Sequence, residues 1–227
     1  GNTRILDRST TLTALTSVSF KDNKEGVFGV RVTRALELPS NKPAVFVDAE
    51  GNPTEVKVLD NTRVNGNYLS SEGLEGDDVW GTRAEWVKLY STMDREPVSV
   101  TIIDHPNNVG YPTYWHARGY GLFAANPLGQ EVFSKGKESL NFVLKKGESK
   151  TFKYRMLIHN GTILKPKDVK KFSFVESMYE SYFDGSDLSK WVLPKNNIWW
   201  TPENGVLKVK SGPEKTIKFF VYCFGLE

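Results

Sequence analysis

Short runs of β-branched and aromatic residues, each ended by turn residues, recur along most of the chain. The clearest run covers residues 149–159, where apolar side chains occupy every second position. Such alternation places them on one face of a strand, and they are Phe152, Tyr154, Met156 and Ile158. No stretch with helical spacing occurs before residue 166. The pattern therefore predicts an all-β fold, with antiparallel strands packed as a sandwich.

Other strands are expected where the same pattern recurs. The Thr-rich segment 9–20 predicts a strand broken near Ala14, and 27–38 predicts a long strand. Segments 84–91 and 97–103 flank a turn, which predicts an antiparallel pair. Further short apolar runs cover residues 44–48, 120–129 and 139–144.

Two segments depart from the strand pattern. Residues 59–78 are rich in Asn, Gly, Ser, Glu and Asp, so a long polar loop is expected there. Residues 166–182 have apolar side chains at helical spacing and Pro166 near the start, which predicts one short helix and a linker.

The chain changes character after residue 182. Asn204-Gly205 lies between two apolar runs and is a strong hairpin signal. The run 217–225 is apolar at almost every position. An apolar run of this kind needs a partner, so residues 216–225 are expected to add a strand to this domain or to a partner chain, which makes a homodimer through the tail one outcome.

Composition excludes several classes of protein. The net charge is only +3, and Lys and Arg do not cluster with aromatic residues, so no nucleic-acid surface is expected. Cys223 is the single cysteine, which excludes an intramolecular disulfide. No apolar stretch is long enough to span a membrane. There is no glycine-rich phosphate loop, and no cofactor is expected.

The segment 104–121 follows the predicted strand 97–103 and carries the densest group of polar and aromatic residues. It holds two of the three histidines, His105 and His116, together with Asp104. Imidazole titrates near neutral pH, so either histidine is suited to general acid or base chemistry, with Asp104 as the partner. These three are the candidate catalytic residues.

Five further residues are candidates for substrate binding: Arg118, Trp115, Asn108, Arg31 and His159. Arg118 is suited to binding a carboxylate or polarising a sugar oxygen, and Trp115 to stacking on a sugar face. The structural alternative is that Asp104 caps the loop, His105 bonds the backbone and Trp115 belongs to the core. The histidines have no metal-binding spacing such as HxH or HExxH, so no metal site is expected.

Several motifs between about Leu12 and Gly161 resemble one family. They are Lys24-Glu25-Gly26 with Arg31, Arg83-Ala84-Glu85-Trp86, the segments 104–108 and 112–121, and the run from Gly147-Glu148 to His159-Asn160-Gly161. In these the chain is similar to the C-terminal half of the bacterial PmoA-like family, whose label refers to a methane oxygenase. The resemblance implies a β-sandwich domain over residues 1–165, mutarotase-like or jelly-roll-like, with further strands upstream.

A second resemblance begins at residue 183. The motif Phe183-Asp184-Gly185 through Trp191, followed by Trp200 through Leu207, is similar to the opening of the 3-keto-disaccharide hydrolase-type domain. That resemblance implies a fragment of a concanavalin-like sandwich over residues 183–227, joined to the first domain by a linker or helix at 166–182.

Both resemblances imply secreted or periplasmic handling of glycans in bacteria. The first function hypothesis is a carbohydrate-active protein, glycoside hydrolase-like, with histidine acid/base chemistry. The alternative is a non-catalytic carbohydrate-binding or structural β-sandwich module. A shared pocket holding both imidazoles and a carboxylate would favour the enzyme, and separated or buried histidines would favour the module.

Overall fold

The computed structural model describes residues 2–47, 50–174, 200–203, 206–209 and 221–222. The chain divides into two compact units, residues 1–174 with 219–227, and residues 175–218. The described part of the second unit is an antiparallel pair, β13 (Trp200–Glu203) with β14 (Val206–Val209). Glu203 pairs with Val206 across the turn, so the hairpin predicted at Asn204-Gly205 is confirmed.

The first unit is built on a five-stranded antiparallel sheet. In spatial order its strands are β1 (Thr3–Thr13), β12 (Ser149–Asn160), β8 (Glu96–Asp104), β7 (Trp86–Met93) and β6 (Asn67–Ser70). The predicted pair 84–91 and 97–103 is confirmed as β7 and β8, which are hydrogen-bonded neighbours. The sheet therefore brings the first strand of the chain beside β12.

A second sheet has four strands. Its order is β15 (Val221–Tyr222), β3 (Phe28–Arg31), β10 (Leu122–Asn126) and β9 (Tyr114–Ala117). β15 runs parallel to β3, whereas the other pairs are antiparallel. Part of the apolar tail thus adds a strand to this domain, as the sequence predicts. Two smaller pairs are β2 (Val18–Phe20) with β11 (Phe142–Leu144), and β4 (Ala44–Val47) with β5 (Pro53–Val56).

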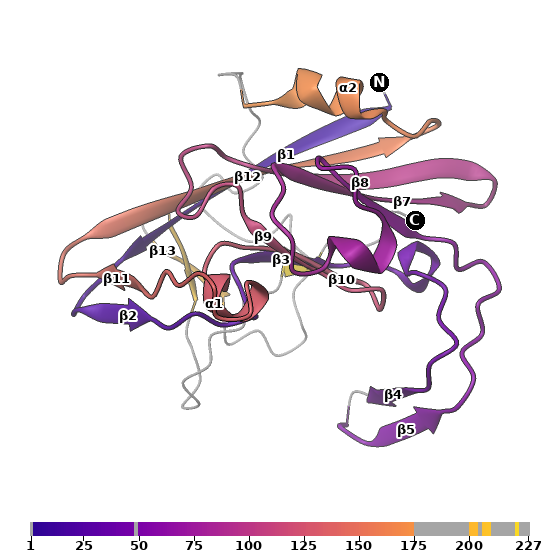
Figure 1. Cartoon of the computed structure of the whole chain (residues 1–227), viewed down its shortest axis with the longest axis horizontal. Helices are drawn as coiled ribbons and strands as arrows, with labels where there is room; N and C mark the ends of the chain where they lie inside the picture. Colours follow the sequence, from indigo (N-terminus) through magenta and orange to yellow (C-terminus); the bar gives the residue numbers. More distant parts are fainter. Residues whose placement is uncertain (1, 48–49, 175–199, 204–205, 210–220, 223–227) are drawn as a thin grey trace. The chain divides into compact units, whose positions relative to one another are not determined.

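The two larger sheets pack face to face around one apolar core, which confirms the all-β sandwich (Figure 1). Both sheets contribute fully buried aromatic side chains, including Tyr68, Trp115, Phe123, Phe152 and Tyr154. The inward residues of β12 are those that the alternation predicts. Burying these large rings is the main favourable contribution to folding.

The outer face of the five-stranded sheet is also covered. α2 (Pro166–Val169) and the 3-10 turn η3 (Lys170–Phe172) lie there, on the side away from β9 and β10 (Figure 1). A second apolar cluster joins them to the sheet, formed by Trp86, Ile103, Leu157, Leu164 and Val169. A strand with both faces buried carries apolar residues without alternation, which explains the run Trp86-Val87 in β7.

Two differences from the sequence predictions have physical causes. The strand expected over 27–38 ends at Arg31, because the chain turns into η1 (Arg34–Leu36). The polar loop expected over 59–78 is wrong in part, since it contains β6 and η2 (Gly76–Val79). Pairing with β7 and burial of Tyr68 outweigh the polar composition there.

The remaining helical segments are short. α1 (Gln130–Phe133) was not expected from the sequence. The helix predicted over 166–182 is present from Pro166 to Phe172, and its remainder beyond residue 174 lies outside the described residues. Within the part of the chain that the structure describes, no helix is long and apolar enough to cross a membrane.

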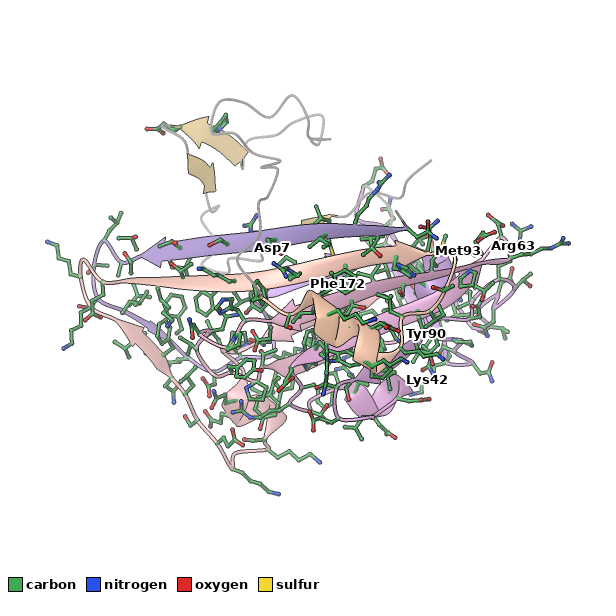
Figure 2. The ribbon with its side chains drawn as sticks, turned by 90° about the horizontal axis from the view of Figure 1, so that it is seen from above. Asp7, Lys42, Arg63, Tyr90, Met93 and Phe172 are labelled. Atoms are coloured by element: carbon green, nitrogen blue, oxygen red, sulfur yellow. The ribbon has the colours of Figure 1, made fainter. Side chains whose placement is uncertain are left out.

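Arg155 holds residues 164–174, the covering segment, to the outer face of the sheet. Its Nε and one terminal nitrogen donate to the two carboxylate oxygens of Asp7 at 2.7 and 2.8 Å. The other terminal nitrogen donates to the carbonyl oxygens of Phe172 and Ser173, both at 2.9 Å. Figure 2 labels the two ends of this bridge, Asp7 on β1 and Phe172 at the end of the helical segment. One buried side chain thus joins β1, β12 and the segment that follows η3.

Replacing Arg155 with Met should destabilise the fold by about 2–4 kcal/mol, because it leaves a carboxylate and two carbonyl oxygens without their donor. Urea denaturation measures the loss. The matched control is Arg4→Met at an exposed position near the start of β1, for which a change within about 0.5 kcal/mol is expected. Equal stability of the two variants would contradict the bridging role.

Candidate functional site

A pocket of about 520 Å³ opens on the outer face of the five-stranded sheet. It lies between the start of β7, the loop that follows β8, and the segment around η3. Its lining combines aromatic rings with groups that donate and accept hydrogen bonds: Glu85, Trp86, His105, Tyr111, Lys170 and Phe174. Such a combination in a concave site is typical of small-molecule binding.

The Arg155 bridge fixes one wall of this pocket. The guanidinium carbon lies 4.7 Å from the centre of the Phe174 ring, next to the carbonyls that Arg155 binds. Phe174 in turn packs its ring against the imidazole of His105, with centres 4.5 Å apart. The buried Arg155 and the Phe174 ring that lines the pocket are therefore parts of one packed unit.

His105 lines the pocket as a neutral imidazole. Its Nδ1 accepts a hydrogen bond from the Asn107 backbone N–H at 3.0 Å. That bond requires a lone pair on Nδ1, so the ring proton is on Nε2. Burial lowers the pKa of His105, and the positive charge of Lys153 adds to this effect. His105 thus presents an N–H donor to a ligand at neutral pH.

Asp104 and Asn108 hold the loop that carries His105. Asp104 is 2% exposed, and its two oxygens accept from Asn108 Nδ2 at 2.7 Å and from the Thr113 N–H at 2.9 Å. Asn108 also donates to the Lys153 carbonyl and accepts from the Lys153 N–H. The Asp104–Thr113 bond joins the two ends of the loop, as the loop-capping alternative for Asp104 predicts, and Asn108 ties the loop to β12.

Burial raises the pKa of Asp104 to about 7, although the Asn108 and Thr113 hydrogen bonds favour the charged form. Tyr111 shows a shift of related origin. Burial and the neighbouring Glu85 carboxylate raise the pKa of the Tyr111 phenol to about 12. Tyr111 therefore keeps its proton at neutral pH, and Glu85 provides an exposed carboxylate at the mouth of the pocket.

Trp115, His116 and Arg118 lie elsewhere, on and just after β9. Trp115 is fully buried in the core, and its Nε1 donates to the Ala84 carbonyl at 2.9 Å. The next residue, His116, points to the opposite face of β9 and bonds the Lys24 carbonyl oxygen through Nδ1 at 2.9 Å. Arg118 Nε donates to His116 Nε2 at 3.2 Å. Burial lowers the pKa of His116.

His159 and Arg31 occupy two further places. The buried His159 ring lies between the hydroxyls of Thr3 and Thr162, at 2.7 and 2.9 Å. Arg31 is exposed, with its guanidinium 5.3 Å from the Tyr120 ring centre. Of the eight predicted site residues, Asp104 and His105 line the pocket and Asn108 supports them. The other five do not join them, and His105 and His116 share no site.

Sequence reasoning missed most of the pocket. Glu85, Tyr111, Lys170 and Phe174 carry no motif of their own, because three distant segments bring them together. The sequence held two signals for them: Tyr111 lies in the polar and aromatic segment 104–121, and Glu85-Trp86 lies in one of the motifs that resemble a family. Among the residues that the structure describes, no three His, Cys, Asp or Glu side chains are grouped to hold a metal ion.

Comparison with known proteins gives one match. The model of DUF6807, described as a family of unknown function, matches residues 1–172. Neither the PmoA-like family nor the 3-keto-disaccharide hydrolase-type domain is found, so both resemblances drawn from the motifs are wrong. No curated protein and no solved structure matches the chain.

Asp104 should give the protein a measurable pH dependence. Its ordinary pKa of 3.8 is raised to about 7 in the folded state, so the folded protein binds this proton more tightly than the unfolded chain. The carboxyl therefore favours folding below about pH 4, and this contribution is lost as the pH rises to about 7.

The free energy of unfolding of the wild type minus that of Asp104→Asn should accordingly decrease from pH 4 to pH 7. Chemical denaturation at several pH values measures this difference, and all other ionisable groups are common to both proteins. Asp94→Asn at the exposed turn between β7 and β8 is the control. A difference that does not vary with pH would contradict the raised pKa of Asp104.

Proposed function

The chain belongs to DUF6807, a family whose function is not known, and we propose that this member binds a small carbohydrate without catalysing its conversion. The proposed site is the pocket beside His105. The observation that carries the proposal is its lining, where aromatic surfaces stand beside both donors and acceptors in about 520 Å³.

A sugar ring matches that lining in two ways. Its C–H face packs on aromatic rings, for which Trp86 and Phe174 are available. Its hydroxyls both donate and accept hydrogen bonds. The Glu85 carboxylate accepts them, whereas the Nε2–H of His105 and the ammonium of Lys170 donate. The volume lies within the range of about 300–1,000 Å³ common for small-molecule pockets.

The states of the candidate acid and base favour binding over catalysis. A general base needs a free lone pair, but the proton on His105 Nε2 and the bond to Nδ1 leave none. Most glycosidases use two carboxyl groups on either side of the scissile bond. Glu85 and Asp104 are the acidic residues that line the pocket, and both oxygens of Asp104 are already hydrogen-bonded within the loop.

The remaining expectations form part of the same proposal. A periplasmic or extracellular location suits a glycan-binding protein. A homodimer through the tail stays a prediction, and the pairing of Val221–Tyr222 with β3 gives this part of the tail a partner within its own chain. The glycoside hydrolase-like alternative would require Glu85 to act with a second group.

Isothermal titration with a panel of mono- and disaccharides tests the proposal. Glu85→Gln and Tyr111→Phe should each lower the affinity for the sugar by about tenfold, since each removes or weakens one hydrogen bond to a ligand oxygen. Glu96→Gln, an exposed substitution at the far end of β8, should leave the affinity unchanged.

The same samples, analysed for products after long incubation, test the absence of catalysis. No saturable binding of any sugar would overturn the proposal. Conversion of a sugar by the wild type that is abolished in Glu85→Gln would replace it with the enzymatic alternative.

A further inference from the structure

Arg118 is held in a fixed orientation on the outer face of the four-stranded sheet. Trp115 and Ala117 point into the core, so the residues that alternate with them face outward. The Arg118 guanidinium carbon lies 4.6 Å from the centre of the Trp80 ring, and Nε is bonded to His116. Two of its sides are thus occupied, one by an indole and one by a buried imidazole.

The hydrogen bonds around His116 agree with one another. Arg118 can only donate, so His116 Nε2 must accept and the ring proton is on Nδ1. That proton is donated to the Lys24 carbonyl oxygen at 2.9 Å. Since His116 is only 3% exposed, the imidazole is a rigid, neutral support for the guanidinium.

Arg118 has no carboxylate partner among the described residues. Three other arginines of this domain form ion pairs with carboxylates, namely Arg34 with Glu37, Arg83 with Glu138 and Arg155 with Asp7. Arg118 forms no ion pair with any residue that the structure describes, and its terminal nitrogens donate to none of them. A half-buried guanidinium with a free edge is prepared to bind an oxyanion.

A neighbour of Arg118, Trp80, has a second donor without a partner in the described part of the chain. Trp80 Nε1 is buried, and it has no hydrogen-bond acceptor among the described residues. Buried N–H groups are rarely left unpaired, so an acceptor is expected close by. Two carboxylates lie in this neighbourhood: that of Glu25, which pairs with Lys24 and acts on the His116 imidazole, and that of Asp77, which lies beside Gly119. Neither is paired with Arg118.

We propose that Arg118 and Trp80 form a second binding site, distinct from the His105 pocket, that takes the carboxylate of a small organic acid. The planar guanidinium edge matches a planar carboxylate with two parallel hydrogen bonds. The partly exposed indole of Trp80 gives the carbon skeleton of the acid an apolar surface, and the buried ring of Phe133 packs against that indole with its centre 5.7 Å away. The site is independent of carbohydrate binding in the other pocket.

Indole N–H signals in a heteronuclear NMR titration test this proposal on the intact chain. Trp80 reports on the second site and Trp86 on the pocket, and Trp→Phe variants assign the two signals. The probes are acetate, D-glucuronate, D-glucose and inorganic phosphate at constant ionic strength. Acetate and glucuronate should shift the Trp80 signal saturably, whereas glucose should leave it unchanged.

Arg118→Lys should weaken carboxylate binding by about tenfold or more, because it removes the paired donors. Arg31→Lys is the matched control, since Arg31 lies on β3 of the same sheet and its guanidinium also lies over an aromatic ring, that of Tyr120. The Arg31→Lys variant should bind carboxylates as tightly as the wild type. If Arg118→Lys fails to fold, the titration of the wild type with acetate and glucuronate still shows whether a carboxylate binds beside Trp80.

Three results would overturn the site: no saturable Trp80 shift with either carboxylate, unchanged affinity in folded Arg118→Lys, or tighter binding of phosphate than of both carboxylates. A glucose shift at Trp86 concerns only the proposed carbohydrate pocket, so failure of one proposal leaves the other testable.

Discussion

The five-stranded sheet is apolar on both faces, and the rest of the domain depends on how each face is covered. The four-stranded sheet covers the inner face through side-chain packing. The outer face is covered by a short segment held by two buried cations, since Lys88 Nζ donates to the Leu164 carbonyl at 2.6 Å and Arg155 donates to those of Phe172 and Ser173. Burial lowers the pKa of Lys88, which is the cost of placing an ammonium group there. These hydrogen bonds hold residues 164–174, which include α2 and η3, against the sheet, and the pocket lies between this segment and the sheet.

All three histidines are used as hydrogen-bonding parts of the fold. His105 accepts from the backbone of its own loop, His116 supports Arg118, and His159 lies between two threonine hydroxyls. His105 and His116 suggested acid/base chemistry and His159 substrate binding, yet each ring has a nitrogen hydrogen-bonded to a neighbouring residue. The groups left for a ligand in the pocket are less conspicuous in a sequence, because carboxylates, phenols and ammonium groups occur everywhere on protein surfaces.

The sequence predicted strands correctly where one face of the strand is buried and its apolar residues alternate with polar ones. The alternation in β12 predicted which side chains enter the core and that Arg155 lies opposite. It could not predict β6, where polar residues form a strand because β7 lies beside them. The site was only partly predictable for the same reason. Asp104 and His105 lie at the end of a strand that the sequence predicts. Glu85 and Phe174 lie in segments far apart in the sequence and line one pocket only because the covering segment packs on the sheet. The family motifs misled, because short shared patterns did not correspond to a family match.

The pairing of β1 with β12 has a consequence for how this domain is made. The two strands are paired over their whole length, from Thr3 with His159 to Thr13 with Ser149. During synthesis β1 emerges before β12, which is complete only after residue 160 has been added. Contacts between such distant segments slow folding, since a long loop must close before they form. Until then β1 is an unpaired strand, and its run of Ser9, Thr10 and Thr11 gives it a polar surface that discourages association with other chains.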